Sequence, residues 1–397
     1  MRPVQEAYLR WHKWRLKKGR KSLQRTVAIT LVAVSLLFIG IRIVVVPPTS
    51  FFREPSEIVL PPPTSVLHPS TPVVPALSTK IPFATKKTDS LFPEYLESFP
   101  QHGKDEPGVH YRLENTRMLN QPGSREEDSL LFIVVFNDAD SWGSNRSVND
   151  YFQLLNSMDF PKEKLSVALL TSSMDEFLKV KKIFRREIQN YARLSVIFRN
   201  DFSQEGLTRN NRHLDHLQLQ RRRMLARYRN YALLSFLETW HQHVIWLDAD
   251  IVDVPPHLPL KMIQSGLDIV TPICMRKFNH ETNEGYDYDL NAWVGHRKVR
   301  LSTSEDFVPG PLSSRNMHDL QGEGQDVVPL DSVGGTMIYI RADIHRQGVV
   351  FPHHYIIGSE WGREGYDGIE TEGLCYSAHF LGYKCWGMPN ELIYHDV

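Results

Sequence analysis

Short apolar runs alternate with segments of helical spacing from about residue 129 onward. Four such runs span 131–136, 165–170, 194–198 and 244–247, and the first is apolar throughout, as expected of a strand covered on both faces. Later in the chain, residues 336–340 have the composition of another strand. The segments with helical spacing are 148–158, 174–191, 218–240 and a stretch from 369 to about 381. This alternation predicts one α/β domain over residues 129–397, built on a mostly parallel central sheet.

The N-terminal region has a different pattern. Residues 27–46 are apolar apart from Thr30, Ser35 and Arg42, and about 20 such residues are needed to cross a bilayer. Nine of the 46 Lys and Arg precede this span, within the first 25 residues. A positive flank of this kind remains cytoplasmic. We therefore expect a cytoplasmic tail at 1–26, a single transmembrane signal anchor at 27–46, and a lumenal remainder. A cleaved signal peptide is the alternative, but no Ala-x-Ala site follows.

Proline dominates the next segment. Residues 47–107 contain 13 of the chain's 25 prolines, which disfavours both helices and central strands. We interpret residues 47–128 as a Pro-rich lumenal stem. The short span before it suits the thinner membranes of the early secretory pathway, so we expect an early Golgi location. In that compartment Asn145 would begin a glycosylation sequon, and Cys375 could pair with Cys385, although buried free thiols are equally compatible with the sequence.

Two acidic residues follow the strand at 244–247. Asp248 and Asp250 lie at its carboxyl end, where open α/β sheets bind ligands. Residues two apart in an extended segment point the same way, so both carboxylates face one spot and repel each other unless a cation neutralises them. A divalent metal that holds a nucleotide diphosphate meets that need, whereas the alternative is a surface turn with two solvated acids. Neither a dinucleotide-binding nor a P-loop glycine motif follows the first strand.

Four further segments carry candidate chemistry. The helix at 218–240 has five arginines, of which we expect one or two to reach phosphate and most to be solvated. Residues 286–293 combine acids, an amide and aromatic rings, a mixture typical of carbohydrate sites and also of ordinary polar loops. Paired glycines at 334 and 335 allow a close backbone approach to a ligand, and Glu372 lies in the first turn of a predicted helix, where acids often only face the helix dipole.

Taken together, these pieces resemble the fungal Golgi α-mannosyltransferase family of the mannan polymerase complexes, glycosyltransferase family 62. The resemblance spans roughly residues 130–395. It is carried by R-R-R-M-L-A-R-Y-R-N-Y-A-L-L at 221–234, W-L-D-A-D-I-V at 246–252, Y-D-L-N-A-W at 288–293, D-S-V-G-G at 331–335, E-T-E-G at 370–373 and G-M-P-N-E-L-I-Y-H at 387–395. A lone D-x-D is weak, whereas six motifs in this order are specific.

The resemblance implies a GT-A nucleotide-sugar-binding domain, GDP-mannose as the donor and Mn²⁺ as the metal. It makes Asp248, Asp250 and His395 the metal ligands, although spacing alone would leave His395 an ordinary surface residue. The expected donor-binding residues are Arg221, Arg227, Asn230, Asp248 and Asp250, and the expected catalytic residues are Asp289 and Glu372. Imidazole beside carboxylates suits Mn²⁺ better than Mg²⁺.

The implied activity is α-mannosyl transfer to mannan or N-glycan acceptors with retention of configuration, directed to an α-1,6-linked backbone. The implied partners are other mannosyltransferase subunits, and no nucleic acid. Two alternatives stay open: a non-catalytic scaffold subunit, and a metal-dependent transferase that uses another nucleotide sugar. The sequence does not decide between chain-initiating and chain-extending activity.

Overall fold

A computed structural model describes residues 91–202, 206–208, 211, 214–279, 284–297, 311–356 and 368–396. The predicted tail, the predicted anchor and the first 44 residues of the predicted stem lie outside this set. In the part of the chain that is described, no helix combines the length and the apolar character of a membrane span.

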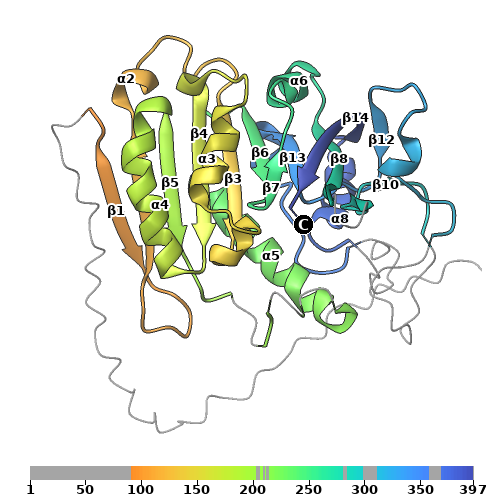
Figure 1. The fold of residues 1–397 in the computed structure, drawn as a ribbon, viewed down its shortest axis with the longest axis horizontal. Coiled ribbons are helices and arrows are strands. Elements are labelled where there is room, and N and C mark those ends of the chain that lie inside the picture. Colours follow the sequence, from red (N-terminus) through yellow and green to blue (C-terminus); the bar gives the residue numbers. More distant parts are fainter. Residues whose placement is uncertain are drawn as a thin grey trace, which may run out of the picture. The chain divides into compact units, whose positions relative to one another are not determined.

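Twelve of the described strands form one sheet, with the order β1-β2-β5-β4-β3-β6-β13-β8-β14-β12 and with β7 and β9 paired to β14 and β8 (Figure 1). The strands are β1 (Glu94–Phe99), β2 (Gly108–Glu114), β3 (Leu130–Phe136), β4 (Leu165–Thr171), β5 (Arg193–Phe198), β6 (His243–Leu247), β7 (Ile251–Asp253), β8 (Ile269–Asn279), β9 (Glu284–Tyr288), β12 (Val328–Leu330), β13 (Met337–Arg341) and β14 (Cys385–His395). A small second sheet pairs β10 (Trp293–Val294) with β11 (Arg315–Asn316).

The centre of the sheet is parallel, as predicted. Strands β5, β4, β3 and β6 run in one direction, and all four are almost wholly buried. The helices are α2 (Thr116–Leu119), α3 (Val148–Asn156), α4 (Met174–Glu187), α5 (Asp215–Phe236), α6 (Leu258–Gln264), α7 (Ala342–Arg346) and α8 (Thr371–Phe380). The α/β class and the predicted helix positions are confirmed, with helix ends that differ by a few residues.

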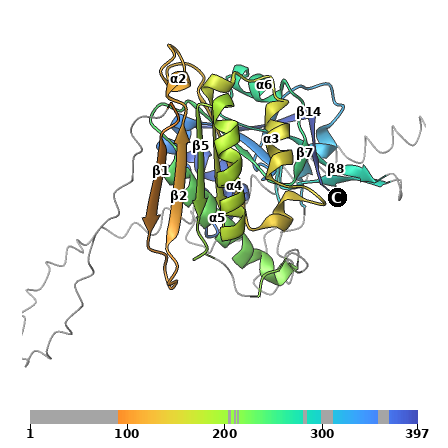
Figure 2. The ribbon, with the colours of Figure 1, turned by 60° about the vertical axis from the view of Figure 1, so that its left-hand side comes forward.

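The sheet has a separate core on each face. Alternate residues of β3 join different hydrophobic clusters, because side chains along a strand point to opposite faces. Phe132 and Val134 pack with α3 and α4, whereas Leu131 and Ile133 pack with α5 and α8. Figure 2 shows α3 and α4 beside each other over one face. Helices on both faces explain why these strands are almost wholly buried.

The predicted boundary between stem and domain is wrong. Residues 94–114 form β1 and β2, and β2 pairs antiparallel with β5 along its whole length. These two strands extend the sheet at one end and are part of the folded domain that was predicted to begin at residue 129. The sequence did not reveal them because β1 carries Glu94 and Glu97 and β2 alternates polar and apolar residues, so neither has the apolar run of a central strand.

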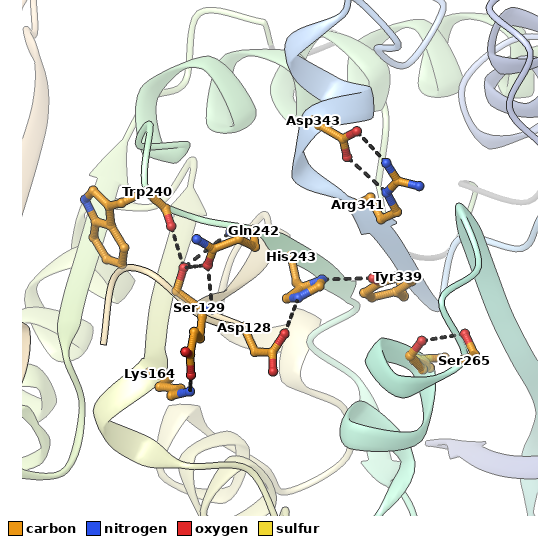
Figure 3. A network of polar contacts seen from close by, with 12 residues as sticks. Asp128, Ser129, Lys164, Trp240, Gln242, His243, Ser265, Tyr339, Arg341 and Asp343 are labelled. Carbon is orange, nitrogen blue, oxygen red and sulfur yellow. Dashed lines mark hydrogen bonds and ion pairs between the residues drawn. The ribbon is translucent and has the colours of Figure 1, made fainter. Parts of the chain in front are cut away.

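A polar network fixes the ends of β3 and β6 that lie away from Asp248 (Figure 3). The backbone N–H of Ser129 donates to Gln242 Oε1 at 2.8 Å, and the Ser129 hydroxyl donates to the carbonyl of Trp240 at 2.5 Å. His243 bonds to the Tyr339 hydroxyl at 2.8 Å, which ties β6 to β13. The register of the central strands is therefore held by side chains as well as by the β-ladder.

The structure decides the cysteine question. Cys375 and Cys385 form a disulfide with a Cα–Cα distance of 5.8 Å, so the middle of α8 is linked to the start of β14. Cys274 is a buried free thiol. Asn145 is exposed, as a glycosylation site must be.

His345 is buried in the core in its neutral form. The indole N–H of Trp246 donates to its Nε2 at 3.3 Å, so Nδ1 carries the proton and donates to the carbonyl of Val349 at 2.7 Å. The pKa of His345 is lowered to about 4, mainly by burial and also by the charge of Arg346, while the hydrogen bond to Val349 acts in the opposite direction.

We predict that this histidine makes the protein sensitive to acid. An unfolded histidine takes up a proton near pH 6.5, whereas native His345 does so only near pH 4. Its contribution is therefore complete above pH 6.5 and is lost as the pH falls, by about 3 kcal/mol in free energy of unfolding at pH 4. Urea unfolding over this pH range measures the loss. His345→Gln keeps a donor and an acceptor but does not titrate, so its stability should fall less steeply than that of the native protein. Parallel curves for the two proteins would contradict this account.

Candidate functional site

Asp248 and Asp250 follow β6 directly and line a cavity of about 470 Å³. The backbone N–H of Asp248 donates to the carbonyl of Thr336 at 2.9 Å, which continues the β6–β13 pairing into the acidic segment. The Asp248 side chain is 37% exposed, whereas that of Asp250 is 11% exposed. The carboxylates therefore lie at the sheet edge where the sequence predicts them.

The cavity lies where the parallel strands end. Asn137 and Asp138 follow β3, and Ser172 follows β4. This is the usual ligand position in an open α/β sheet. The opposite wall comes from α5, whose Arg221, Met224, Leu225, Tyr228 and Arg229 contribute to the lining.

His395 meets Asp250, as the family resemblance implies. Strand β14 ends against β7, and this pairing brings His395 Nε2 to 3.0 Å from Asp250 Oδ2. Its Nδ1 lies 2.6 Å from the Asp396 carbonyl, and the Tyr288 ring stacks on the imidazole at a centroid distance of 3.9 Å. Burial lowers the pKa of His395, but the hydrogen bond and the charge of Asp250 outweigh burial and raise it overall.

Arg229 is the cationic centre of the site, a role that the sequence analysis missed. Its guanidinium lies 3.1 Å from Asp248 Oδ1 and 2.9 Å from Glu370 Oε1, and it also donates to the Gly335 carbonyl at 3.1 Å. Glu370 has a φ of +63°, which is unusual for a residue with a side chain. Arg229 therefore connects Asp248 to Glu370. This is the first acid of the E-T-E-G motif, whereas the sequence predicted a role in the site for the second, Glu372.

Asp289 is held beside the aspartate pair. Its Oδ2 accepts from the Thr336 backbone N–H and hydroxyl, each at 2.9 Å, and its φ is +57°. A Cβ atom on Gly334 would lie 2.3 Å from the same oxygen. The paired glycines thus allow a carboxylate, rather than a ligand, to approach the backbone closely.

Negative charge exceeds positive charge at this site. The loss of hydrating water within the protein raises the pKa of Asp248 most. The nearby Asp250, Asp289 and Glu370 carboxylates raise it further, whereas Arg229 lowers it. A bound cation would remove this repulsion.

The side chains fit a divalent cation only in part. No three His, Cys, Asp or Glu residues converge on one centre among the residues that the structure describes. Asp250 and His395 offer an oxygen and a nitrogen ligand in contact with each other, whereas Asp248 is bound by Arg229. The Asp396 carbonyl orients the imidazole in the way that outer-sphere partners of metal-bound histidines do.

The arginines of α5 are less solvated than predicted. Arg222 and Arg229 are 9% and 6% exposed. Arg222 lies 2.9 Å from Glu372 Oε2, and Arg297 lies 3.1 Å from Glu372 Oε1. Glu372 is therefore the buried centre of an ion-pair triad, and it is not among the described residues that line the cavity.

The structure places two predicted donor-binding residues elsewhere. Asn230 exchanges two hydrogen bonds of 2.8 Å with the backbone of Phe351, so its side chain joins α5 to the segment after α7. Arg227 is exposed, and its guanidinium lies over the Phe202 ring at 4.1 Å. Neither residue is among the described lining residues, whereas Arg221 is.

The fold and the site are those of an α/β protein with an acidic ligand cavity at the edge of its sheet. The chain belongs to the Anp1 family, whose model matches residues 108–309 and 312–354.

Similar proteins in other fungi are named as subunits of mannan polymerase complexes. The mannan polymerase complex subunit MNN9 of Candida albicans is 27% identical over 309 residues, which is 72% of this chain and 79% of the relative. The mannan polymerase II complex ANP1 subunit of Saccharomyces cerevisiae is 26% identical over 325 residues, which is 77% of this chain and 61% of the relative.

Similarity to solved structures is weaker. The mannosyltransferase PcManGT from Pyrobaculum calidifontis, in complex with GDP-Man and Mn²⁺, has a TM-score of 0.40 and 12% identity over 70% of this chain and 61% of that one. At this score the likeness does not define the fold of the chain.

We predict that Gly334→Ala destabilises the site and that Gly335→Ala does not. The new methyl group at 334 would displace the Asp289 carboxylate from Thr336, at a cost of about 1–3 kcal/mol for buried polar groups left unpaired. A Cβ atom at Gly335 would meet Arg229 at 3.4 Å, an ordinary contact. Urea unfolding of the two variants measures the difference, and equal stabilities would contradict the arrangement.

Proposed function

We propose that the chain is a glycosyltransferase that moves mannose from GDP-mannose to mannose-containing glycans. The observation that carries the proposal is the meeting of Asp250 with His395 beside Asp248, in a cavity whose opposite wall presents Arg221. In a metal-dependent nucleotide-sugar site of the GT-A type, the acids and the histidine would hold the cation and the arginine would bind the diphosphate. Membership of the Anp1 family, with relatives named as mannan polymerase subunits, supports mannose as the transferred sugar.

Each part of the cavity has a role in this proposal. The ends of β3 and β4 offer Asn137, Asp138 and Ser172 to the nucleoside. Arg221 would contact the diphosphate, because a guanidinium forms paired charge-assisted hydrogen bonds with phosphate oxygens. Asp289 is rigid, since Thr336 holds it with two hydrogen bonds, and it would position the acceptor or face the developing positive charge on the sugar.

Asp250 and His395 would hold the cation, and Asp248 would join them if a bound nucleotide drew Arg229 away. A divalent metal at this position supplies electrostatic stabilisation to the departing diphosphate. The nitrogen ligand favours Mn²⁺ over Mg²⁺. The donor and product sugars are both α-linked in this proposal, so transfer retains configuration.

The proposal extends to the setting of the enzyme. The basic tail and apolar span at the N-terminus would anchor it as a single-pass type II protein in the early Golgi, with the catalytic domain in the lumen. The names of the relatives support assembly with other mannosyltransferase subunits and a mannan acceptor. Synthesis of the α-1,6-linked backbone is the activity that we propose.

We predict that Asp250→Asn lowers mannosyl transfer by on the order of 100-fold or more, because the site loses a charged ligand for the cation that stabilises the leaving group. The free energy of unfolding should change little, because the lost repulsion from Asp248 offsets the lost attraction to His395. Transfer is measured with the purified full-length chain, Mn²⁺, GDP-mannose and an α-mannoside acceptor.

Asp253→Asn is the matched control. Asp253 is exposed at the end of β7, three residues further on. The Asp253→Asn variant should therefore retain full activity. Substantial turnover by Asp250→Asn would contradict the role of Asp250. A native chain that binds GDP tightly without transfer would instead support the scaffold alternative, and activity only with UDP-sugars would support the other donor class.

A further inference from the structure

A second cavity, of about 530 Å³, lies between α8, the start of β14, β12 and the segment around β10. Its described lining shares no residue with that of the first cavity. The Cys375–Cys385 disulfide forms part of its wall and links α8 to β14. Ligand cavities in proteins typically enclose about 300–1,000 Å³, so this one is large enough for a ligand of several rings.

Aromatic rings dominate the lining, which includes Trp293, Tyr376, Tyr383 and Trp386. Tyr383 and Trp386 are half-buried, so they combine a fixed position with exposed ring surface. Trp293 is 7% exposed, and its indole N–H has no hydrogen-bond partner among the described residues. A buried donor without a partner is costly, so a ligand hydroxyl at this place would be stabilising.

The cavity also offers polar groups of both kinds. Asp331 and Lys384 contribute one charge of each sign, and Asp331 accepts a 2.7 Å hydrogen bond from the Gly295 backbone. Arg297 is paired with Glu372, and its guanidinium lies over the Trp293 ring at 4.3 Å. His296 and His379 add imidazole groups to the lining. Ring faces beside scattered donors and acceptors suit the C–H faces and hydroxyl edges of sugars.

A chain of side chains joins this cavity to Asp289. Arg297 lines the cavity and binds Glu372 at 3.1 Å, and Glu372 binds Arg222 at 2.9 Å. Arg222 Nη2 lies 3.4 Å from Asn291 Oδ1, and Asn291 Nδ2 lies 3.3 Å from Asp289 Oδ1. The segment 289–297 thus has Asp289 close to Asp248, which lines the first cavity, and Trp293 in the lining of the second.

We infer that the second cavity is a glycan-binding subsite that holds mannose units of the acceptor remote from the unit that reacts. The identification of the sugar as the acceptor rests on the proposed function, whereas binding of the oligosaccharide does not. Tyr383 and Trp386 would stack on sugar rings, and the Trp293 indole N–H would donate to a hydroxyl.

The test is direct binding of an α-linked mannopentaose to the full-length chain, measured by titration calorimetry. We expect Tyr383→Ala to weaken binding roughly 5-fold or more through loss of ring contact, while Tyr383→Phe stays within about 2-fold of the native chain. Tyr95→Ala is the matched control, because Tyr95 is also a half-buried tyrosine but lies on β1 at the opposite end of the sheet. Equal affinities for the native chain, Tyr383→Ala and Trp386→Ala would overturn the inference.

Transfer assays separate this inference from the proposed function. With a long acceptor, Tyr383→Ala should raise KM without changing kcat, and transfer to methyl α-mannoside should be unaffected. A chain that transfers mannose with the same KM for the long acceptor in every variant would refute the subsite and retain the enzyme. Tyr383-dependent binding by a native chain without transfer activity would support the subsite and contradict the proposed enzyme.

Discussion

The site depends on the repulsion among four carboxylates, which one buried arginine balances only in part. Asp248 and Glu370 bind Arg229 directly, and Asp250 and Asp289 lie close enough to raise the pKa of Asp248. Such a cluster is unfavourable in a folded protein unless positive charge balances it. Arg229 supplies part of that charge and His395 another part when it is protonated. The remaining deficit is what a divalent cation with a nucleotide diphosphate would use.

The fold brings these groups together from distant parts of the chain. The central parallel strands place the aspartate pair at their carboxyl ends, and β14 returns His395 to the same edge through its pairing with β7 and β8. The triad centred on Glu372 connects α5, whose other residues line the first cavity, to Arg297, which lines the second. A donor cavity and a glycan subsite connected in this way would serve one transfer reaction.

Continuous apolar runs and local spacing predicted the parallel strands, the main helices and the position of Asp248 and Asp250. The meeting of His395 with Asp250 followed only from the family resemblance, because spacing cannot show that the tail returns to the sheet. Strands β1 and β2 escaped prediction because neither has a continuous apolar run: half of the residues of β1 are exposed, and β2 alternates polar and apolar residues. The sequence also did not predict which groups the side chains of α5 would contact. Helical spacing could not show that Arg229 binds Asp248, or that Asn230 binds the Phe351 backbone.

The central claim is that a cation and a nucleotide diphosphate together relieve the repulsion among these carboxylates. Titration calorimetry of GDP into the full-length chain, with and without Mn²⁺, tests it most directly. The account predicts that Mn²⁺ tightens GDP binding at least 10-fold, a coupling of about 1.4 kcal/mol or more. The same GDP affinity with and without the metal would contradict it.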